Sequence, residues 1–241
     1  MTVGIGVITR NRPELLSELL HSIQDTTKDS PYAITTFVGI DRDDVSASVC
    51  ERWGVPYGYT PVPGIPANRN ITAHALKDCD IIILFEDDTK PTKAGWLERI
   101  VHALEPGDIP FLFSLAPRMH GEVMACMPCK NAQVDLYPLS SAFTIAFPRK
   151  TLETVGYWSP AFGERYGFDE AEWGLRVKKA YGWNPDLWPS LSDTEEYLEV
   201  IVNTPSSDSK SVEERGEEIL LNHTIWCKLI ADANQYQPYP Y

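Results

Sequence analysis

Residues 81–91 read IIILFEDDTKP, where five apolar residues are followed directly by Glu86, Asp87 and Asp88. The apolar run predicts a fully buried β-strand that ends at the three carboxylates. Because adjacent negative charges repel one another and are costly to bury unpaired, the cluster needs water, cationic side chains or a metal ion close by. The alternative interpretation is a solvated turn, since strands often end in Asp-rich turns.

Strand-like segments alternate with helical ones through the first 92 residues. We predict strands over residues 3–8, 34–40 and 55–60, and a helix over residues 65–79 that leads into the strand at Ile81. This alternation predicts an α/β fold with a mostly parallel twisted sheet and helices on both faces. Such sheets bind ligands outside the carboxyl ends of their strands, so we expect the segments TRNRP, DRDD and EDD to face one crevice.

The segment after the first predicted strand begins a helix. Pro13 suits its first turn, Asn11 and Glu14 have the spacing of a capping box, and one helical face carries Leu15, Leu16, Leu19, Leu20 and Ile23. Free N–H groups and the dipole at a helix start favour an anion. Thr9, Arg10 and Asn11 are therefore candidate contacts for a phosphate group.

The acidic cluster offers the hard oxygen ligands that Mg²⁺ or Mn²⁺ prefers. Mg²⁺ usually takes one or two protein carboxylates and leaves its other positions to water and substrate phosphates. A diphosphate fits this arrangement, and Arg69 could add a bidentate contact to it. The alternative for Arg10 and Arg69 is solvation at the surface or a plain salt bridge to the acidic turn.

The second half of the chain continues the sheet with longer insertions. We predict helices over residues 93–104 and 167–182 and strands over residues 111–116 and 141–147. Residues 116–140 and 184–210 are predicted to be lids, binding loops or disordered. The sequence contains no internal repeat and no linker that divides it. We therefore expect a single domain over residues 1–241.

Composition narrows the class of protein. The 241 residues are 43% hydrophobic, and 21 Lys plus Arg against 34 Asp plus Glu give a formal charge of -13. This charge disfavours nucleic acid as a partner. The N-terminal segment has no features of a signal peptide and no apolar run approaches the ~20 residues of a membrane-spanning helix, so we expect a cytoplasmic protein. Five Cys at irregular spacing indicate free thiols rather than a disulfide framework.

A second group of carboxylates lies in the segment GFDEAEWGLRV, residues 167–177. Asp169, Glu170 and Glu172 fall in the first turn of a predicted helix, where the helix dipole alone could account for them. A carboxylate held beside a substrate hydroxyl could also act as a general base, because burial and like-charged neighbours raise its pKa.

Two further motifs can be explained without a role in binding or catalysis. His223 lies in the predicted helical segment EEILLNHTIWCKL, where a lone His is more often a packing or surface residue than a ligand. The C-x-x-C at residues 126–129 has no second Cys pair, so it does not predict a zinc site.

Together these motifs resemble the GT-A glycosyltransferases, in particular family two, over most of the chain. VGIGVITRNRPELLSELLHSI is similar to the family's first strand and helix, VGIDRDD to its second strand, and GIPANRNITAHAL to its helix with an Arg-Asn pair. CDIIILFEDDTKP resembles the strand that ends in a D-x-D motif, AFPRKTLETVGYWSPAF the stretch before the acceptor side, and DEAEWGLR the E-D-x-E-x-x-x-R pattern. Two departures are Glu in the first D-x-D position and an acid pair that reads Asp-Glu instead of Glu-Asp.

The resemblance implies a GT-A, Rossmann-like fold whose residues 1–92 bind a nucleotide-sugar, with a UDP-sugar expected. In this family Asp41 would contact the base, and Arg69 together with the loop of Thr9, Arg10 and Asn11 the nucleotide. Glu86 would lie at the ribose or donor sugar, and Asp87 would also take part in binding the nucleotide-sugar. Asp88 would bind the Mn²⁺ or Mg²⁺ cofactor that bridges the diphosphate.

The resemblance also assigns residues 93–241 to acceptor binding and catalysis, with insertions on the acceptor side. Glu170 stands where inverting enzymes carry the catalytic carboxylate, with Asp169 beside it. His223 suits the late His that completes the metal site in several members. The implied reaction moves the sugar to an acceptor hydroxyl.

Other functions are open on the sequence alone. A nucleotidyltransferase would need a Gly-rich, Lys-bearing loop near the N-terminus, which the sequence lacks. A protein that binds a nucleotide-sugar or a divalent ion without turnover is a further alternative. The acceptor could be a glycan, a protein, a small molecule or, as for some phage enzymes of this fold, a modified DNA base, although the charge of -13 counts against DNA.

Overall fold

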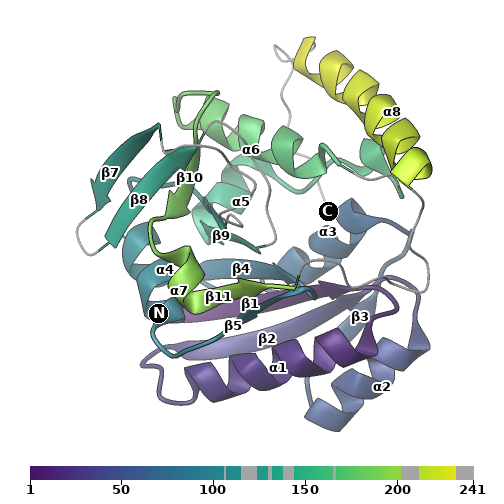
Figure 1. Cartoon of the computed structure of the whole chain (residues 1–241), viewed down its shortest axis with the longest axis vertical. Coiled ribbons are helices and arrows are strands. Elements are labelled where there is room, and N and C mark those ends of the chain that lie inside the picture. Colours follow the sequence, from purple (N-terminus) through teal and green to yellow (C-terminus); the bar gives the residue numbers. More distant parts are fainter. Residues whose placement is uncertain are drawn as a thin grey trace.

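A six-stranded sheet forms the centre of the computed structural model (Figure 1). The structure describes residues 1–105, 107–114, 124–129, 132–137, 144–164, 167–201 and 212–231. The sheet has the order β3-β2-β1-β4-β9-β6, with β1 (Thr2–Thr9), β2 (Ala33–Ile40), β3 (Tyr57–Tyr59), β4 (Ile81–Glu86), β6 (Leu112–Ser114) and β9 (Thr144–Pro148). The first four strands of this order are parallel, and β9 is antiparallel to β4 and β6.

Helices connect and cover these strands. They are α1 (Pro13–Thr27), α2 (Asp44–Trp53), α3 (Ile65–Ala75), α4 (Trp96–Leu104), α5 (Arg149–Val155), α6 (Asp169–Ala180), α7 (Thr194–Tyr197), α8 (Val212–Ala231) and the 3₁₀ turn η1 (Pro160–Phe162). Two small sheets lie beside the main one: β10 (Trp188–Leu191), β8 (Ala132–Tyr137) and β7 (Ala125–Cys129) form the first, and β11 (Leu198–Val200) pairs with β5 (Thr89–Pro91) in the second.

The side chains of β4 alternate between two hydrophobic cores. Ile81, Ile83 and Phe85 pack with residues of α1, α2 and α4, while Ile82 and Leu84 pack with α3, α5 and α6. Figure 1 shows α1 on one side of the sheet and α3 and α6 on the other. Because every side chain of this strand before Glu86 is buried, the apolar run reads without the polar alternation of a half-exposed strand.

Helix α3 lies unusually close to the sheet. A Cβ atom on Gly39 would lie 2.0 Å from Oδ1 of Asn68 and 2.2 Å from Oγ1 of Thr72, so only glycine allows this approach. The Asn68 amide also donates to the carbonyl of Thr9 at 3.2 Å. Helix α3 is thereby held against the carboxyl ends of β1 and β2.

The predicted strands and helices agree with the structure, and the differences are at the start of α1 and in the predicted loop regions. The capping box predicted at Asn11 and Glu14 is wrong, because Arg12 occupies the N-cap position and Pro13 begins α1. Asn11 instead has φ of 53° and its backbone N–H donates to Asp43 at 2.8 Å, so it turns the chain.

Of the predicted loop regions, residues 124–129 and 132–137 of 116–140 and residues 184–201 of 184–210 are described. They form β7, β8, β10, α7 and β11, so the prediction of loops or disorder is wrong there. Strands β10 and β11 pair with partners that are distant in the chain, which local sequence patterns do not identify.

Trp158 belongs to the core and not to an exposed stacking surface. It is fully buried, and its ring stacks on Trp173 with centroids 4.7 Å apart and an interplanar angle of 12°.

Among the described residues, none of the helices has the length and apolar character needed to cross a membrane.

Candidate active site

The acidic turn at the end of β4 reaches toward both faces of the sheet. Strand alternation directs Glu86 to the face of α3 and α6 and Asp87 to the face of α1. Each carboxylate meets an arginine there: Arg69 from α3 on one side and Arg12 from the start of α1 on the other. The cationic neighbours that the three acids require are therefore supplied by the protein itself.

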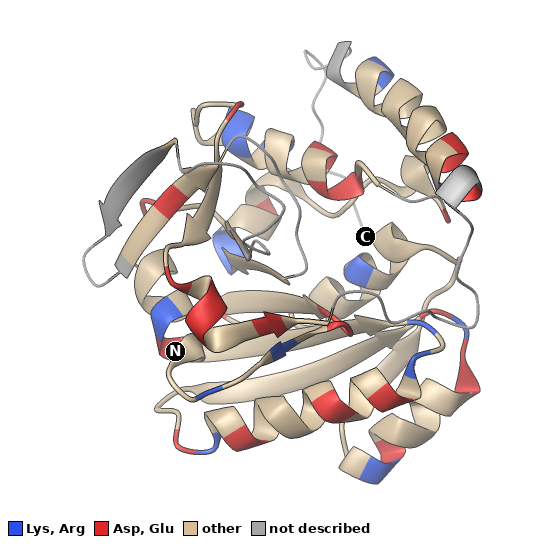
Figure 2. Ribbon diagram, in the orientation of Figure 1, with Lys and Arg blue, Asp and Glu red and all other residues tan. Residues whose placement is uncertain are grey.

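Arg69 joins the acidic turn to the start of α6. Its Nη2 donates to Oε1 of Glu86 at 2.6 Å and also to Oε1 of Glu170, while Nη1 donates to Oδ2 of Asp169. The Arg69 side chain is only 2% exposed. Figure 2 shows the basic position in α3 and the acidic start of α6 on the same side of the sheet. The structure thus unites four predicted site residues in one ion cluster.

The second arginine pairs with the rest of the turn. Nη1 of Arg12 lies 2.9 Å from Oδ1 of Asp87 and 3.1 Å from Oδ2 of Asp88. The Thr9 hydroxyl donates to the other oxygen of Asp87 at 2.7 Å. Arg12 was not among the predicted site residues, although its position in the TRNRP segment at the end of a strand is a signal for such a role.

Asp41 occupies a third position at the same sheet edge. Its Oδ2 accepts from the backbone N–H of Gly64 at 3.1 Å and from Arg10 at 3.4 Å, and its Oδ1 accepts from the Thr60 hydroxyl at 3.3 Å. Asn11 is tied into this edge through its bond to Asp43. These polar side chains therefore gather at the carboxyl ends of β1, β2 and β4, as the order of the strands predicts.

Burial controls the charge state of the acidic residues. It raises the pKa of Glu86 well above the ordinary range, against the opposing effect of Arg69. Burial likewise raises the pKa of Asp87 to about 6, and the pKa of Asp88 and of Glu170 also increases, with Asp169 adding to the effect on Glu170. Carboxyl groups with increased proton affinity suit general acid–base chemistry near neutral pH.

Asp88 retains capacity for a cation. Its Oδ1 is buried and accepts no hydrogen bond from the described part of the chain, while its Oδ2 is paired with Arg12. Among the described residues no three His, Cys, Asp or Glu side chains form a group that could hold a metal ion. A cation here would therefore take one or two carboxylate ligands from the protein and the remainder from substrate or water.

His223 has an aromatic environment in α8. Its ring centroid lies 5.4 Å from that of Phe168 and 5.6 Å from that of Trp226, and Nε2 lies 3.6 Å from Sγ of Cys227. These contacts place it beside the residue that precedes α6. The metal contact suggested for His223 stays a prediction.

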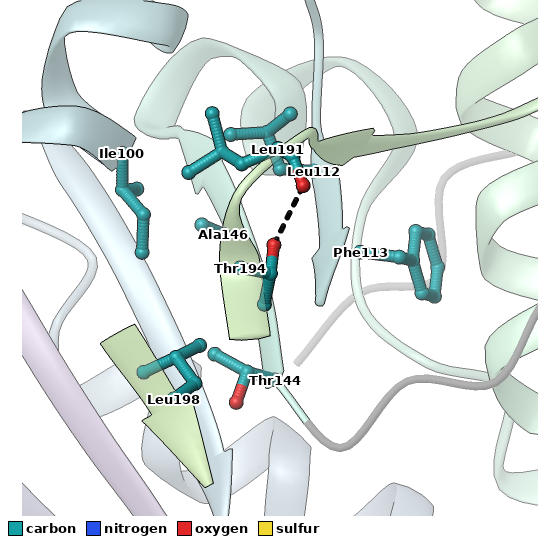
Figure 3. A pocket seen from close by; sticks show the side chains of 8 residues that line it. All are labelled: Ile100, Leu112, Phe113, Thr144, Ala146, Leu191, Thr194 and Leu198. Atoms are coloured by element: carbon teal, nitrogen blue, oxygen red, sulfur yellow. Dashed lines mark hydrogen bonds between the residues drawn. The ribbon is translucent and has the colours of Figure 1, made fainter. Parts of the chain in front are cut away.

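A small apolar cavity lies elsewhere in the fold (Figure 3). Its lining consists of Ile100, Leu112, Phe113, Thr144, Ala146, Leu191, Thr194 and Leu198. The Thr194 hydroxyl donates a hydrogen bond to the backbone carbonyl of Leu191 at 2.8 Å, which the dashed line in Figure 3 marks. Because the lining offers no titratable group, this cavity is a packing feature and not a second centre for chemistry.

Comparison with solved structures places this geometry in a known fold. Mannosyl-3-phosphoglycerate synthase from Rubrobacter xylanophilus superposes with a TM-score of 0.66 and 11% identity over 99% of this chain and 77% of its own. A mutant β1,4-galactosyltransferase 7 from Drosophila, in complex with manganese, UDP-Gal and xylobiose, gives 0.57 and 13% over 90% and 79%. The chain has the GT-A fold.

A third similar structure is a mannosyltransferase from Pyrobaculum calidifontis in complex with GDP-Man and Mn²⁺. Its TM-score is 0.54 at 16% identity, over 73% of this chain and 51% of its own, so the present chain spans about half of that protein. No family model matches the chain, and neither does any curated protein. The GT-A fold predicted from the motifs is confirmed.

Proposed function

We propose that this protein is a metal-dependent glycosyltransferase that moves a sugar from a nucleoside-diphosphate sugar to an acceptor hydroxyl. The observation that carries the proposal is the ion cluster in which the acidic turn after β4 meets Asp169 and Glu170 of α6. A donor-side acidic turn and an α6 carboxylate are the two parts that such a transfer needs. The GT-A fold of the similar glycosyltransferases supports the same reaction class.

The donor would lie along the carboxyl ends of the parallel strands. Asp41 is buried at 5% exposure beside the loop of Thr9, Arg10 and Asn11, which supports a role in holding the nucleoside. A UDP-sugar stays our expected donor. One similar structure contains UDP-Gal and another GDP-Man, so both bases belong in the test.

Asp88 is the proposed ligand of Mn²⁺ or Mg²⁺. The buried oxygen of Asp88 without a hydrogen-bond partner in the described chain fits a hard cation. When bound, the cation would neutralise negative charge that builds on the leaving diphosphate. Arg12 lies at the same carboxylates and can supply positive charge beside them.

Glu170 is the proposed general base. The Glu170 side chain is 22% exposed and that of Asp169 is 4% exposed, and both pair with Arg69, so Glu170 has the better access to an acceptor. In the reaction the acceptor oxygen forms a bond to the anomeric carbon, the bond from that carbon to the diphosphate breaks, and the acceptor proton passes to Glu170. Attack from the face opposite the leaving group would make the transfer inverting.

The proposed donor contacts and the proposed base lie in different halves of the chain. Residues 1–92 would form the nucleotide-sugar half, because the proposed donor contacts lie at the carboxyl ends of β1, β2 and β4. Residues 93–241 would form the acceptor and catalytic half through α6. Both halves contribute strands to one sheet, which supports a single domain over residues 1–241.

Thermal unfolding with a panel of nucleotides tests the proposal. UDP, GDP, UDP-galactose, UDP-glucose and GDP-mannose are each added with Mn²⁺ and with EDTA. A ligand at about 100 times its Kd stabilises the folded state by ~2.7 kcal/mol, which increases the melting temperature measurably. We expect a shift with one base, dependent on metal and lost in Asp88→Asn; a melting temperature that no nucleotide changes would refute the donor site.

A further inference from the structure

Helix α3 ties the sheet edge to the segment that precedes α6. The Asn70 amide donates to the carbonyl of Trp158 at 2.9 Å, and its oxygen accepts from the N–H of Trp158 at 2.8 Å. At the start of the helix, a Cβ on Gly64 would lie 2.2 Å from the carbonyl oxygen of Gly163. Helix α3 is therefore fixed to residues 158–163 at two points, one on each side of Arg69.

Arg69 extends this attachment to the carboxylates themselves. A single nitrogen, Nη2, donates both to Glu86 of the acidic turn and to Glu170 of α6, and Nη1 donates to Asp169. One guanidinium group thus determines how far the donor-side carboxylate lies from the carboxylate of α6. Its planar fork suits several carboxylates at once, which a single ammonium group does not match.

The same contacts argue against a direct role with phosphate. The Arg69 side chain is 2% exposed, and both terminal nitrogens are engaged by carboxylates. The burial of this arginine is balanced by three acids, whose proximity increases its pKa against the effect of desolvation. A phosphate would have to displace at least one of these carboxylates.

We propose that Arg69 is a positioning residue that sets the orientation of Glu170, and not a ligand of the diphosphate. This inference depends on the proposed function, because it concerns the base of that reaction. Arg69 donates to Oε1 of Glu170 and thereby fixes the direction of this carboxylate. Displacement of a base by about 1 Å costs about 100-fold in rate, so the loss of Arg69 reduces turnover and spares donor affinity.

The test is Arg69→Lys compared with wild type and with Arg176→Lys. Arg176 of α6 is the matched control, because it is as buried as Arg69, with 2% of its side chain exposed. It pairs with Glu172 and not with the carboxylates that contact Arg69. Turnover is measured as nucleoside diphosphate released from UDP-galactose, UDP-glucose and GDP-mannose with Mn²⁺ and water as acceptor. Donor affinity is measured by calorimetric titration below the melting temperature of each variant.

We expect Arg69→Lys to reduce kcat by about 10- to 100-fold with donor Kd changed less than about threefold, and Arg176→Lys to keep kcat. An equal loss of donor affinity in Arg69→Lys would identify a phosphate ligand, and an equal loss of kcat in Arg176→Lys would indicate general disruption; each overturns the inference. A normal kcat in Arg69→Lys overturns this inference but leaves the proposed function unaffected.

Two further outcomes are distinguishable. Wild-type protein that neither binds nor turns over any donor overturns the proposed function and this inference with it. If Arg69→Lys does not fold, the double variant Arg69→Met, Asp169→Asn removes one buried charge of each sign and carries the same expectation.

Discussion

Nη1 of Arg12 lies 3.1 Å from Oδ2 of Asp88, so an arginine pairs with the carboxylate that we propose as the metal ligand. The same nitrogen contacts Asp87 at 2.9 Å. A fixed positive charge at this distance weakens the attraction between the carboxylates and a divalent cation. The protein therefore carries its own counter-ion at the proposed metal site.

Replacement of Arg12 by Gln should tighten Mn²⁺ binding in the absence of nucleotide. Loss of one positive charge beside Asp87 and Asp88 increases the local negative potential, and we expect a Kd lower by about tenfold, or about 1.4 kcal/mol. Electron paramagnetic resonance of free Mn²⁺ in a titration measures this Kd. Arg99→Gln is the matched control, because Arg99 pairs with Asp193 away from the turn. Weaker Mn²⁺ binding in Arg12→Gln would contradict the view that the positive charge of Arg12 opposes binding of the cation.

The two acids at the start of α6 should separate by their phenotypes. Glu170→Gln keeps the shape of the side chain but removes the proton acceptor, so we expect kcat to fall by about 100- to 10,000-fold with donor affinity retained. Asp169→Asn should instead reduce the free energy of unfolding by about 3 kcal/mol, because it leaves Arg69 without one buried partner.

Steady-state kinetics and urea unfolding of both variants measure these effects. If Glu170→Gln retains full turnover while Asp169→Asn loses it, the roles that we assign are reversed. A protein that binds nucleotide-sugar without turnover would show no change of rate in either variant, because the wild type would have none.

Local patterns were sufficient to predict the main sheet and the helices that cover it, but not the two small sheets. The run at residues 81–85 is buried on both faces, so hydrophobicity alone identified the strand, and the helices on either side keep their apolar stripes. The direction of β9 could not be read in the same way. A short apolar run has no polarity along the chain, and its antiparallel pairing with β4 depends on the path of the intervening residues.

The candidate site was predicted as residues but not as contacts. Arg69 and Asp169 lie 100 positions apart in the chain, and only the packing of α3 and α6 on one face of the sheet brings them together. The sequence suggested either a phosphate contact for Arg69 or a salt bridge to the acidic turn, and its described contacts include the salt bridge to Glu86 together with two carboxylates of α6. The pairing of Arg12 with Asp87 follows from strand alternation, a rule that was available before the structure.

Gly39→Ala should destabilise the protein through α3. The added Cβ would lie about 2 Å from polar side-chain atoms of Asn68 and Thr72, and overpacking of this kind costs about 1–3 kcal/mol. Urea unfolding monitored by circular dichroism measures the change. Gly216→Ala is the control, because nothing lies within 4 Å of a Cβ there and alanine favours a helix. Equal stability in the two variants would show that α3 is not tightly packed on β2.

Lys178 should make the stability of the protein depend on pH. Its side chain is fully buried in α6, where Nζ donates to the carbonyls of Pro185 at 2.5 Å and Leu187 at 3.3 Å and lies 3.3 Å from the ring centroid of Trp188. Desolvation lowers the pKa of Lys178 to about 7, against the opposing charge of Asp186. The unfolded chain binds the same proton with the ordinary lysine pKa of ~10.4.

The unfolded state therefore holds more protons than the folded state between pH of about 7 and ~10.4, and the free energy of unfolding should rise with pH across that window. Lys178→Met should remove this part of the slope, since it leaves no group to titrate. Urea unfolding of wild type and variant from pH 6.5 to ~9.5 measures the difference, and Lys28→Met, at an exposed ion pair with Asp25, should leave the slope unchanged. Parallel pH profiles for wild type and Lys178→Met would mean that Lys178 keeps its proton as firmly in the folded protein as in the unfolded chain.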